Sequence, residues 1–310
     1  MNEALVLTYH GILPEIPSDQ PPYEYRNFVE SDLFEKQLHF LLKNYRPLRI
    51  TDFFDPDVSL RKGFFLTFDD GYRNNHSYAL PILNKYGLQA CFFVTTNLVG
   101  THNFLWTDQV TRLIHRTRKS RLKLHSTKKF NFNLNGDKNR EITSEKLRAF
   151  MKSIHPDMVE DVFNQLFSQL SDVDRSMGRD EEERYLFLNW DEIRDMRRQG
   201  HIIGSHTHTH PILSTLTEQE SYRELKISKE IIEKQTGQPC LVFSYPNGEK
   251  KDYKELQKKQ LKELGYQCAF TSIRPFDGFP TSPYELCRVN ISRKMPMPVF
   301  EAVISGFKKR

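Results

Sequence analysis

The chain has 310 residues, of which 38% are hydrophobic and 27% are charged, so it is long enough for a large α/β domain with a packed core. Its formal net charge of +5 is modest, and we expect no nucleic-acid partner. No stretch approaches the ~20 apolar residues of a transmembrane helix, and the first ten residues lack a secretory signal. We therefore expect a cytoplasmic protein without a transmembrane segment. The four cysteines occur singly and indicate buried thiols.

The first hundred residues alternate strand-like and helix-like segments. Short apolar runs that stop at polar residues or turn signals predict strands, and amphipathic spacing predicts helices. In chain order, we expect a strand over Ala4–Tyr9, a Pro-rich loop over Ile12–Tyr25, a helix over Ser31–Asn44, a strand from Phe64 that stops at Asp69, a helix over His76–Tyr86 and a strand over Ala90–Thr96.

The alternation fails over about residues 100–185, from Gly100 to Tyr185. This segment combines a helix near Trp106–Thr117, a basic stretch over Arg116–Lys129, a polar region near Asn131–Arg140 and an amphipathic run over His155–Leu170. A structureless loop of that length is implausible in a compact domain, so we predict a mostly helical insertion or lid. The basic stretch fits either a phosphate or anionic lipid, as in peripheral membrane contact, or the solvated face of an inserted helix.

Regular alternation returns after the insertion. We expect helices over Asp191–Gln199, Thr217–Gln235, Tyr253–Glu263 and Pro298–Gly306, and strands over His201–Ser205, Pro239–Tyr245, Gln267–Thr271 and Cys287–Ile291. Seven strand candidates, each with a helical pattern at or near its end, predict a parallel α/β fold. We interpret residues 1–310 as a single domain whose strands form a closed or nearly closed barrel, not an open sheet.

Polar residues follow the carboxyl ends of several different predicted strands. They are His10, the pair Asp69 and Asp70, the pair His206 and His210, and the turn Tyr245–Gly248. Parallel barrels assemble their active sites at these strand ends, which favours a barrel with one shared site. Neither a Gly-x-Gly-x-x-Gly nor a Walker sequence is present, so a nucleotide cofactor is unsupported.

Two adjacent carboxylates at a strand end repel each other unless a cation or a division of roles relieves them. Asp70 with His206 and His210 forms a ligand set typical of catalytic zinc or a similar divalent ion. We place the two histidines, four residues apart, on one helical turn with both rings on the same side, while His208 points elsewhere. Asp69 is then a general base beside the metal or, alternatively, a second ligand.

These residues resemble the polysaccharide deacetylases, also called the NodB homology domain or carbohydrate esterase family 4. Thr-Phe-Asp-Asp-Gly at Thr67–Gly71 is similar to the family's first motif, in which the first Asp is the base and the second binds metal. His-Thr-x-x-His-Pro at His206–Pro211 is similar to the second motif, which completes the metal site. Phe-Ser-Tyr-Pro-Asn-Gly at Phe243–Gly248 resembles the third, which lines the groove and offers a backbone N–H to the oxyanion. The resemblance implies substrate contacts at Tyr245, Pro246, Asn247 and Gly248.

The chain departs from the family pattern at two positions. An Arg commonly stands three residues before the Pro of the third motif, where this chain has Phe243. The last motif commonly ends in Leu-x-His, but Leu286–Ser292 contains no histidine. The segment Thr8–Ile12 resembles the opening Tyr-His segment of the family's permuted branch, in which a first-strand histidine is the general acid. By this resemblance we assign the role of general acid to His10; the alternative is that His10 is a structural histidine. We also expect Arg288 to replace the missing Arg beside Asp69.

The resemblance also implies a fold and an activity. It implies a distorted (β/α)7-type barrel and a divalent metal ion, most simply Zn²⁺ but also Co²⁺ or Ni²⁺. The expected activity is hydrolysis of an N-acetyl or N-formyl group on a sugar that is a free saccharide, nucleotide-linked or lipid-linked, as in surface-polysaccharide or glycolipid assembly. The alternatives are an amidase for a non-sugar amide and an inactive saccharide-binding protein.

Overall fold

A curled sheet of parallel strands forms the centre of the molecule. The computed structural model describes residues 4–16, 24–275 and 282–306, and so omits residues 17–23 of the expected Pro-rich loop. The sheet has the order β11-β10-β9-β6-β5-β1-β12, with β4 beside β5, and curls into a half-barrel. Its strands are β1 Leu5–Tyr9, β4 Arg46–Pro47, β5 Gly63–Phe68, β6 Ala90–Val94, β9 Ile202–Ser205, β10 Val242–Ser244, β11 Cys268–Phe270 and β12 Val289–Asn290.

The stretch from Leu286 to Asn290 joins the two ends of the curled sheet, because it runs beside the edge strand β11 and continues as the other edge strand, β12. Leu286 bridges Phe270 of β11 in parallel, and Val289 pairs with Leu7 of β1. Because one short segment contacts both edge strands, Arg288 within it is carried to the inside of the curl. The parallel α/β barrel expected from the sequence is confirmed in this distorted form.

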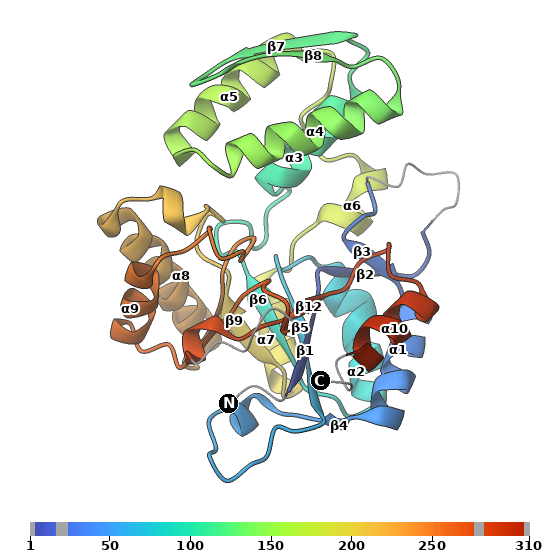
Figure 1. The fold of residues 1–310 in the computed structure, drawn as a ribbon, viewed down its shortest axis with the longest axis vertical. Coiled ribbons are helices and arrows are strands. Elements are labelled where there is room, and N and C mark those ends of the chain that lie inside the picture. The colour runs from blue at the N-terminus through green and yellow to red at the C-terminus, as the bar shows by residue number, and fades with distance from the viewer. Residues whose placement is uncertain (1–3, 17–23, 276–281, 307–310) are drawn as a thin grey trace.

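Helices surround the outer face of the sheet (Figure 1). They are α1 Ser31–Asn44, α2 Leu80–Lys85, α7 Trp190–Arg198, α8 Glu218–Thr236, α9 Glu255–Glu263 and α10 Met297–Gly306. Every residue of β1, β5 and β6 is buried, as in parallel sheets covered on both faces. Alternate residues divide between two apolar clusters, so that Phe64 packs with the helices whereas its neighbour Phe65 belongs to the cluster of Phe93 and Phe270.

The segment between β6 and α7 forms an insertion with a core of its own. It contains α3 Trp106–Arg116, strands β7 Arg121–His125 and β8 Lys129–Asn133, α4 Asp137–Met151, α5 Pro156–Gln169 and α6 Arg179–Tyr185. Figure 1 shows α3, α4, α5 and the β7–β8 hairpin on one side of the barrel, at the top of the view. A buried apolar cluster that includes Leu113, Leu147 and Leu166 holds these elements together.

The basic stretch of the insertion is not the face of a helix. It forms β7, whose Arg121, Lys123 and His125 are exposed while Leu122 and Leu124 are buried. Period-two alternation produced this strand, and the helical interpretation of the stretch was therefore wrong. Gln165 and Gln169 of α5 hydrogen-bond backbone groups of β7 and take the place of a further strand at its edge.

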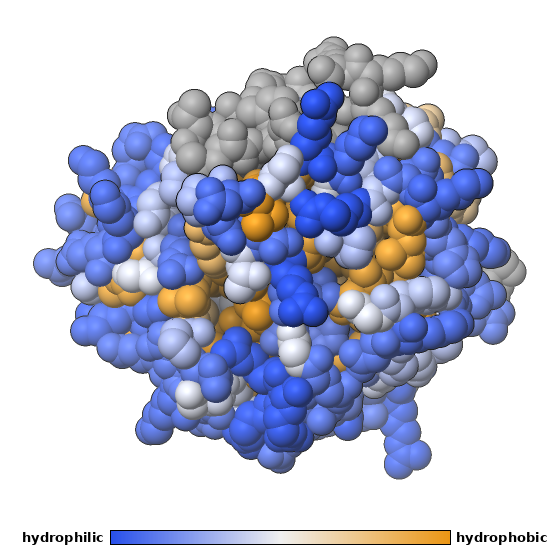
Figure 2. Space-filling model, turned by 90° about the horizontal axis from the view of Figure 1, so that it is seen from below, coloured by the Kyte–Doolittle hydropathy of each residue, from blue (hydrophilic) through white to orange (hydrophobic). Residues whose placement is uncertain are grey.

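Other short elements were not expected from the sequence. A two-stranded parallel pair joins β2 Gly11–Leu13 to β3 Phe28–Glu30, and the helix expected from His76 begins as a π-helical turn over Asn75–Ala79. The end of the molecule opposite the insertion shows a surface dominated by hydrophilic residues, with small apolar areas between them (Figure 2). Among the described residues, no helix combines the length and apolar character that crossing a membrane requires.

Candidate metal and catalytic site

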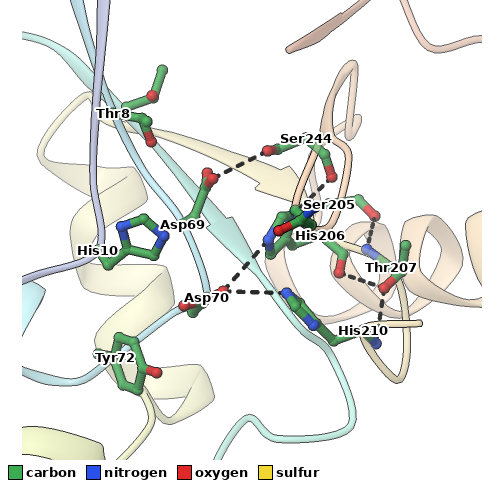
Figure 3. A network of polar contacts seen from close by, with 12 residues as sticks. Thr8, His10, Asp69, Asp70, Tyr72, Ser205, His206, Thr207, His210 and Ser244 are labelled. Atoms are coloured by element: carbon green, nitrogen blue, oxygen red, sulfur yellow. Dashed lines mark hydrogen bonds and ion pairs between the residues drawn. The ribbon is translucent and has the colours of Figure 1, made fainter. Parts of the chain in front are cut away.

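Three buried side chains from two loops form a possible metal-ligand set. The Nε2 atoms of His206 and His210 each lie 3.4 Å from Oδ1 of Asp70, and the three ligand atoms lie within 4.8 Å of one another. Figure 3 shows both rings directed at Asp70. Nδ1 of His206 hydrogen-bonds the carbonyl oxygen of Ser244 at 2.7 Å, which assigns the proton to Nδ1 and leaves Nε2 as the ligand atom.

The two histidines do not share a helical turn, contrary to the prediction. They follow β9 in a loop in which Thr207 and His210 have φ angles of 66° and 62°. The hydroxyl of Thr207 accepts the N–H of His210 at 2.9 Å, and the Glu224 carboxylate accepts the N–H groups of His208 and Thr209. Local hydrogen bonds that compete with helix formation thus shape the loop. As expected, His208 points away, to the hydroxyl of Thr96 at 2.8 Å.

The first loop also has an unusual backbone. Asp70 has a φ angle of 73°, and Gly71 follows with 86°, with its Cα facing Val94 closely enough that a Cβ would lie 3.2 Å from that side chain. A left-handed conformation at a non-glycine residue is strained, and such strain gathers at functional sites. Burial by itself would raise the pKa of Asp70, but its bonds to His206 and His210 hold the pKa well below its usual value.

Asp69 faces the inside of the barrel and pairs with Arg288. The guanidinium approaches the two carboxylate oxygens at 2.8 and 2.7 Å and also contacts Thr67, Ser244 and the carbonyl oxygen of Thr271. Burial tends to raise the pKa of Asp69, yet the charges of Arg288 and then of His206 outweigh it, so the pKa lies below its usual value. Asp69 is therefore an ionised carboxylate held in a fixed orientation beside the ligand set.

His10 follows β1 on the other side of the two aspartates from His206 and His210 (Figure 3). The side-chain amide of Asn75 donates a hydrogen bond of 2.8 Å to the backbone carbonyl oxygen of His10, which fixes the chain at this point. Its charged form would lower the pKa values of both Asp69 and Asp70, so the ring is close to them electrostatically. Nδ1 is buried without a hydrogen-bond partner among the described residues. The ring is thus near the pair but not bonded to it.

Of the four residues predicted to contact substrate in the third loop, only Asn247 is not buried. The Tyr245 side chain is 1% exposed, stacks on Tyr253 at 4.2 Å and donates a hydrogen bond to the carbonyl oxygen of Tyr284, so it lies in the core. Pro246 and Gly248 are buried too, and Asn247 has a φ angle of 60°. Any substrate contact at the other three positions would therefore come from the backbone.

Strand alternation also corrects the position of the missing Arg. Phe243 packs against Tyr245 and Tyr266 in the core, whereas the hydroxyl of Ser244 lies 2.9 Å from Arg288 and 3.4 Å from Asp69. The position that faces the base is thus Ser244, not Phe243, because successive strand residues point to opposite faces. A polar residue inside the apolar run of β10 was the signal for this in the sequence.

The insertion contributes residues to the site that the sequence did not indicate. Lys152, at the end of α4, donates a hydrogen bond to Oδ1 of Asn247. Burial lowers the pKa of His210, and the Lys152 ammonium makes a smaller contribution in the same direction. Asp108, in the first turn of α3, accepts a hydrogen bond from the buried Tyr72, two residues beyond Asp70, and burial raises its pKa to about 6. These contacts cross more than thirty residues of sequence and left no local pattern.

Comparison with known proteins identifies the family. Residues 59–269 match the family model described as polysaccharide deacetylase, which is more than half of the chain. The chain belongs to the polysaccharide deacetylase family. The match includes the Asp69 and Asp70 loop, the two histidines and the third loop, but ends before Arg288.

Curated relatives of this chain come from Bacillus subtilis (strain 168). The putative polysaccharide deacetylase YxkH is 22% identical over 247 residues, and the peptidoglycan-N-acetylmuramic acid deacetylase PdaA is 39% identical over 82 residues. The alignments cover 80% and 26% of this chain but only 58% and 30% of the relatives. The chain therefore aligns with less than two thirds of either relative.

Solved structures share its fold over almost the whole chain. The Streptococcus pyogenes deacetylase PplD, solved with acetate, and IcaB from Ammonifex degensii each give a TM-score of 0.60 at 18% identity. The alignment covers 97% of this chain and 97% of PplD, and 98% of this chain and 97% of IcaB. The polysaccharide deacetylase BC0361 from Bacillus cereus gives 0.59 at 21% identity, with 98% of this chain and 69% of BC0361 covered. These structures support the barrel assignment.

Proposed function

We propose that this family member is a metal-dependent hydrolase that removes an N-acetyl or N-formyl group from a sugar during the assembly of a surface polysaccharide or glycolipid. The observation that carries the proposal is the juxtaposition of a buried Asp-His-His ligand set with an ionised carboxylate held by Arg288. Cys91, Cys240 and Cys268 are buried free thiols, which suits a reducing compartment, so we place the reaction in the cytoplasm. A nucleotide-linked or lipid-linked sugar is the substrate form present there.

The donor set fits a divalent metal ion. One carboxylate and two imidazoles are three ligands of the kind that leave further coordination positions open in catalytic zinc sites, and Co²⁺ or Ni²⁺ suits the same donors. The hydrogen bond from Nδ1 of His206 to Ser244 is the outer contact that orients such a ligand. Asp70, His206 and His210 would hold the ion, which when bound lowers the pKa of water and polarises the acyl carbonyl group.

The remaining roles belong to the side chains of the chain itself. Asp69 accepts a proton from the attacking water, because Arg288 and Ser244 aim its oxygens and keep it ionised. Water then adds its oxygen to the carbonyl carbon, and a backbone N–H near Asn247 stabilises the charge that develops on the carbonyl oxygen. His10 donates a proton to the sugar nitrogen as the carbon–nitrogen bond breaks. The products are the carboxylate and the free amine.

Amine release from acylated sugars tests the proposal. Protein stripped of metal would be reloaded with zinc, cobalt or nickel and offered N-acetylated and N-formylated sugars, both free and nucleotide-linked or lipid-linked. We expect turnover that depends on the metal and that falls by at least about a hundredfold in Asp69→Asn, which keeps the shape of the side chain but cannot accept the proton. Non-sugar N-acyl amides belong in the same panel.

Metal content separates the alternatives. Asp69→Asn should still bind the metal, since Asp69 is not one of the three ligands, so its inactivity would not result from an empty site. Saccharide binding that survives metal removal, with no hydrolysis of any compound, would instead indicate a binding protein. Hydrolysis confined to the non-sugar amides would indicate an amidase.

A further inference from the structure

The insertion and the site loops enclose cavities of opposite character. One of about 670 Å³ reaches Asn247 and is bordered mainly by polar and charged side chains, such as Arg148, Lys152 and Glu249. Another of about 370 Å³ reaches His210 and is bordered mainly by apolar side chains. We call the second the apolar cavity; it is lined chiefly by Trp106, Met151, Ile154, Val159, Phe163 and Ile212. The candidate ligand His210 thus borders a space that the proposed mechanism does not use.

The apolar cavity is built by the insertion. Val159, Phe163 and Phe167 stand four residues apart on α5 and line it as a stripe, while Val162 and Leu166 of the same helix are buried in the core of the insertion. Phe163 also belongs to that core, and Val159 and Phe167 pack against it, so the stripe faces both the core and the cavity. Trp106, Ile154, Val159 and Phe167 are only partly buried and leave apolar surface on the wall of the cavity.

A hydrogen bond joins the apolar cavity to the metal-ligand loop. The indole N–H of Trp106 donates to the backbone carbonyl oxygen of His210 at 3.1 Å, and Thr209, Pro211 and Ile212 of the same loop also line the cavity. One wall of the apolar cavity is consequently the loop that carries His210. His210 therefore lies at the boundary between the candidate metal site and the apolar cavity.

We propose that the apolar cavity binds the hydrocarbon chain of a lipid-linked sugar, so that the substrate is a glycolipid whose polar part occupies the larger cavity. This inference rests on the proposed function. A second sugar ring fits the apolar cavity less well, because its hydroxyl groups need hydrogen-bond partners. The apolar cavity has fewer hydrogen-bonding side chains than the cavity at Asn247; apart from Trp106, they are Gln109, Glu160, Asn164, Thr209, His210 and Thr215.

Hexyl and methyl glycosides of N-acetylglucosamine test the inference with metal-loaded protein. A buried methylene strengthens binding by roughly fourfold, so even partial burial of the hexyl chain should raise kcat/KM by about tenfold or more over the methyl glycoside. Val159→Trp fills the cavity and should bring the hexyl-to-methyl ratio close to one. Ile142→Trp is the matched control, because Ile142 is an exposed aliphatic residue of the insertion that does not line the cavity. It should keep the wild-type ratio.

Binding is also read from the fluorescence of Trp106 in protein that carries neither Trp substitution and whose second tryptophan is removed by Trp190→Phe. The hexyl glycoside should shift the emission to shorter wavelength, and the methyl glycoside should not. Equal turnover of the two glycosides would overturn the inference and leave the deacetylase proposal standing. A gain that appears instead on lengthening the N-acyl group, or on adding a second sugar, would equally overturn it. Hexyl binding without hydrolysis of any acylated sugar would defeat the proposed function and the glycolipid substrate with it.

Discussion

Arg288 and Asp69 form a two-point ion pair inside the barrel, with nitrogen–oxygen distances of 2.8 and 2.7 Å, although 219 positions separate them in the chain. Arg288 is fully buried and Asp69 is 5% exposed. Such a pair is strongly oriented, and removing either member leaves a buried charge without a partner. The pair therefore ties the proposed base to the segment that connects the two edges of the sheet.

Arg288→Ala should change the pH dependence of the reaction. Burial raises the pKa of Asp69 and Arg288 lowers it, so the variant carboxylate will have a higher pKa than the wild-type one. Because the base must be ionised, the acid limb of the profile of kcat/KM against pH should move to higher pH. The profile is measured between pH 4 and 9. A pH profile of unchanged shape, with kcat/KM reduced equally at every pH, would contradict the role assigned to Arg288.

The same substitution should also cost about 3 to 5 kcal/mol of stability. If Arg288→Ala is too unstable to assay, Arg288→Lys keeps the charge without the two-point geometry and should show a smaller shift in the same direction. Ser244→Ala is the milder control, since it removes one hydroxyl contact to the pair and keeps both charges.

His10→Ala should impair amide hydrolysis far more than substrate binding. A sugar amine leaves poorly without a proton, so we expect kcat to fall by about 10²- to 10⁴-fold with little change in KM. An activated acetate ester, such as p-nitrophenyl acetate, has a leaving group that needs no proton and should be hydrolysed at nearly the wild-type rate. Equal losses on the amide and on the ester would show that His10 does not act as the general acid.

Metal binding should stabilise the folded protein. A ligand that binds only the native state at a hundredfold excess over its Kd adds roughly 2.7 kcal/mol, so treatment with a chelator should lower the melting temperature and added zinc should restore it. His206→Ala should lose this response. His208→Ala should keep it, because His208, although in the same loop as the two ligands, bonds Thr96 after β6 and lies outside the ligand set. If zinc stabilised His206→Ala as much as the wild type, the result would show that His206 is not a metal ligand.

Stability should fall in mild acid because His201 is buried as a neutral ring. Burial lowers its pKa to about 4, from 6.5 in an unfolded chain. Between these values the unfolded state binds the proton and the folded state does not, so stability decreases as the pH falls from about 6.5 to about 4 and is unaffected by this group above 6.5. The loss attributable to His201 should reach about 3 kcal/mol at pH 4.

The hydrogen bonds of His201 provide the physical reason. The N–H of Ala90 donates to Nδ1, and Nε2 faces Oδ1 of Asn84, so protonating Nδ1 removes an acceptor that the backbone uses. Urea unfolding at pH 7 and pH 4.5 compares the wild type with His201→Gln, which cannot titrate. The variant should be less stable at pH 7 but should show a shallower decline with acid. Parallel declines would assign the acid sensitivity to other groups.

Local periodicity predicted the elements that a single segment can specify. The helix expected over Ser31–Asn44 is α1 with the same ends, and the run that stops at Asp69 is β5. These two predictions were correct because the burial of one face of a helix, or of a whole strand, depends on the spacing of apolar residues along the chain. The basic stretch was misassigned because a run of charged residues does not by itself distinguish a strand from a helix, whereas the alternation of its leucines does.

The sequence by itself determined the chemistry available at the site, since Asp69, Asp70, His206 and His210 are recognisable from residue type and spacing after strand ends. Only the tertiary structure decided which groups face them. The side-chain bonds of Thr207 and Glu224 replaced the expected helical turn, strand register turned Ser244 and not Phe243 toward the base, and the curl of the sheet carried Arg288 inside. Such contacts join segments far apart in the chain and depend on register and curvature, which no local pattern encodes.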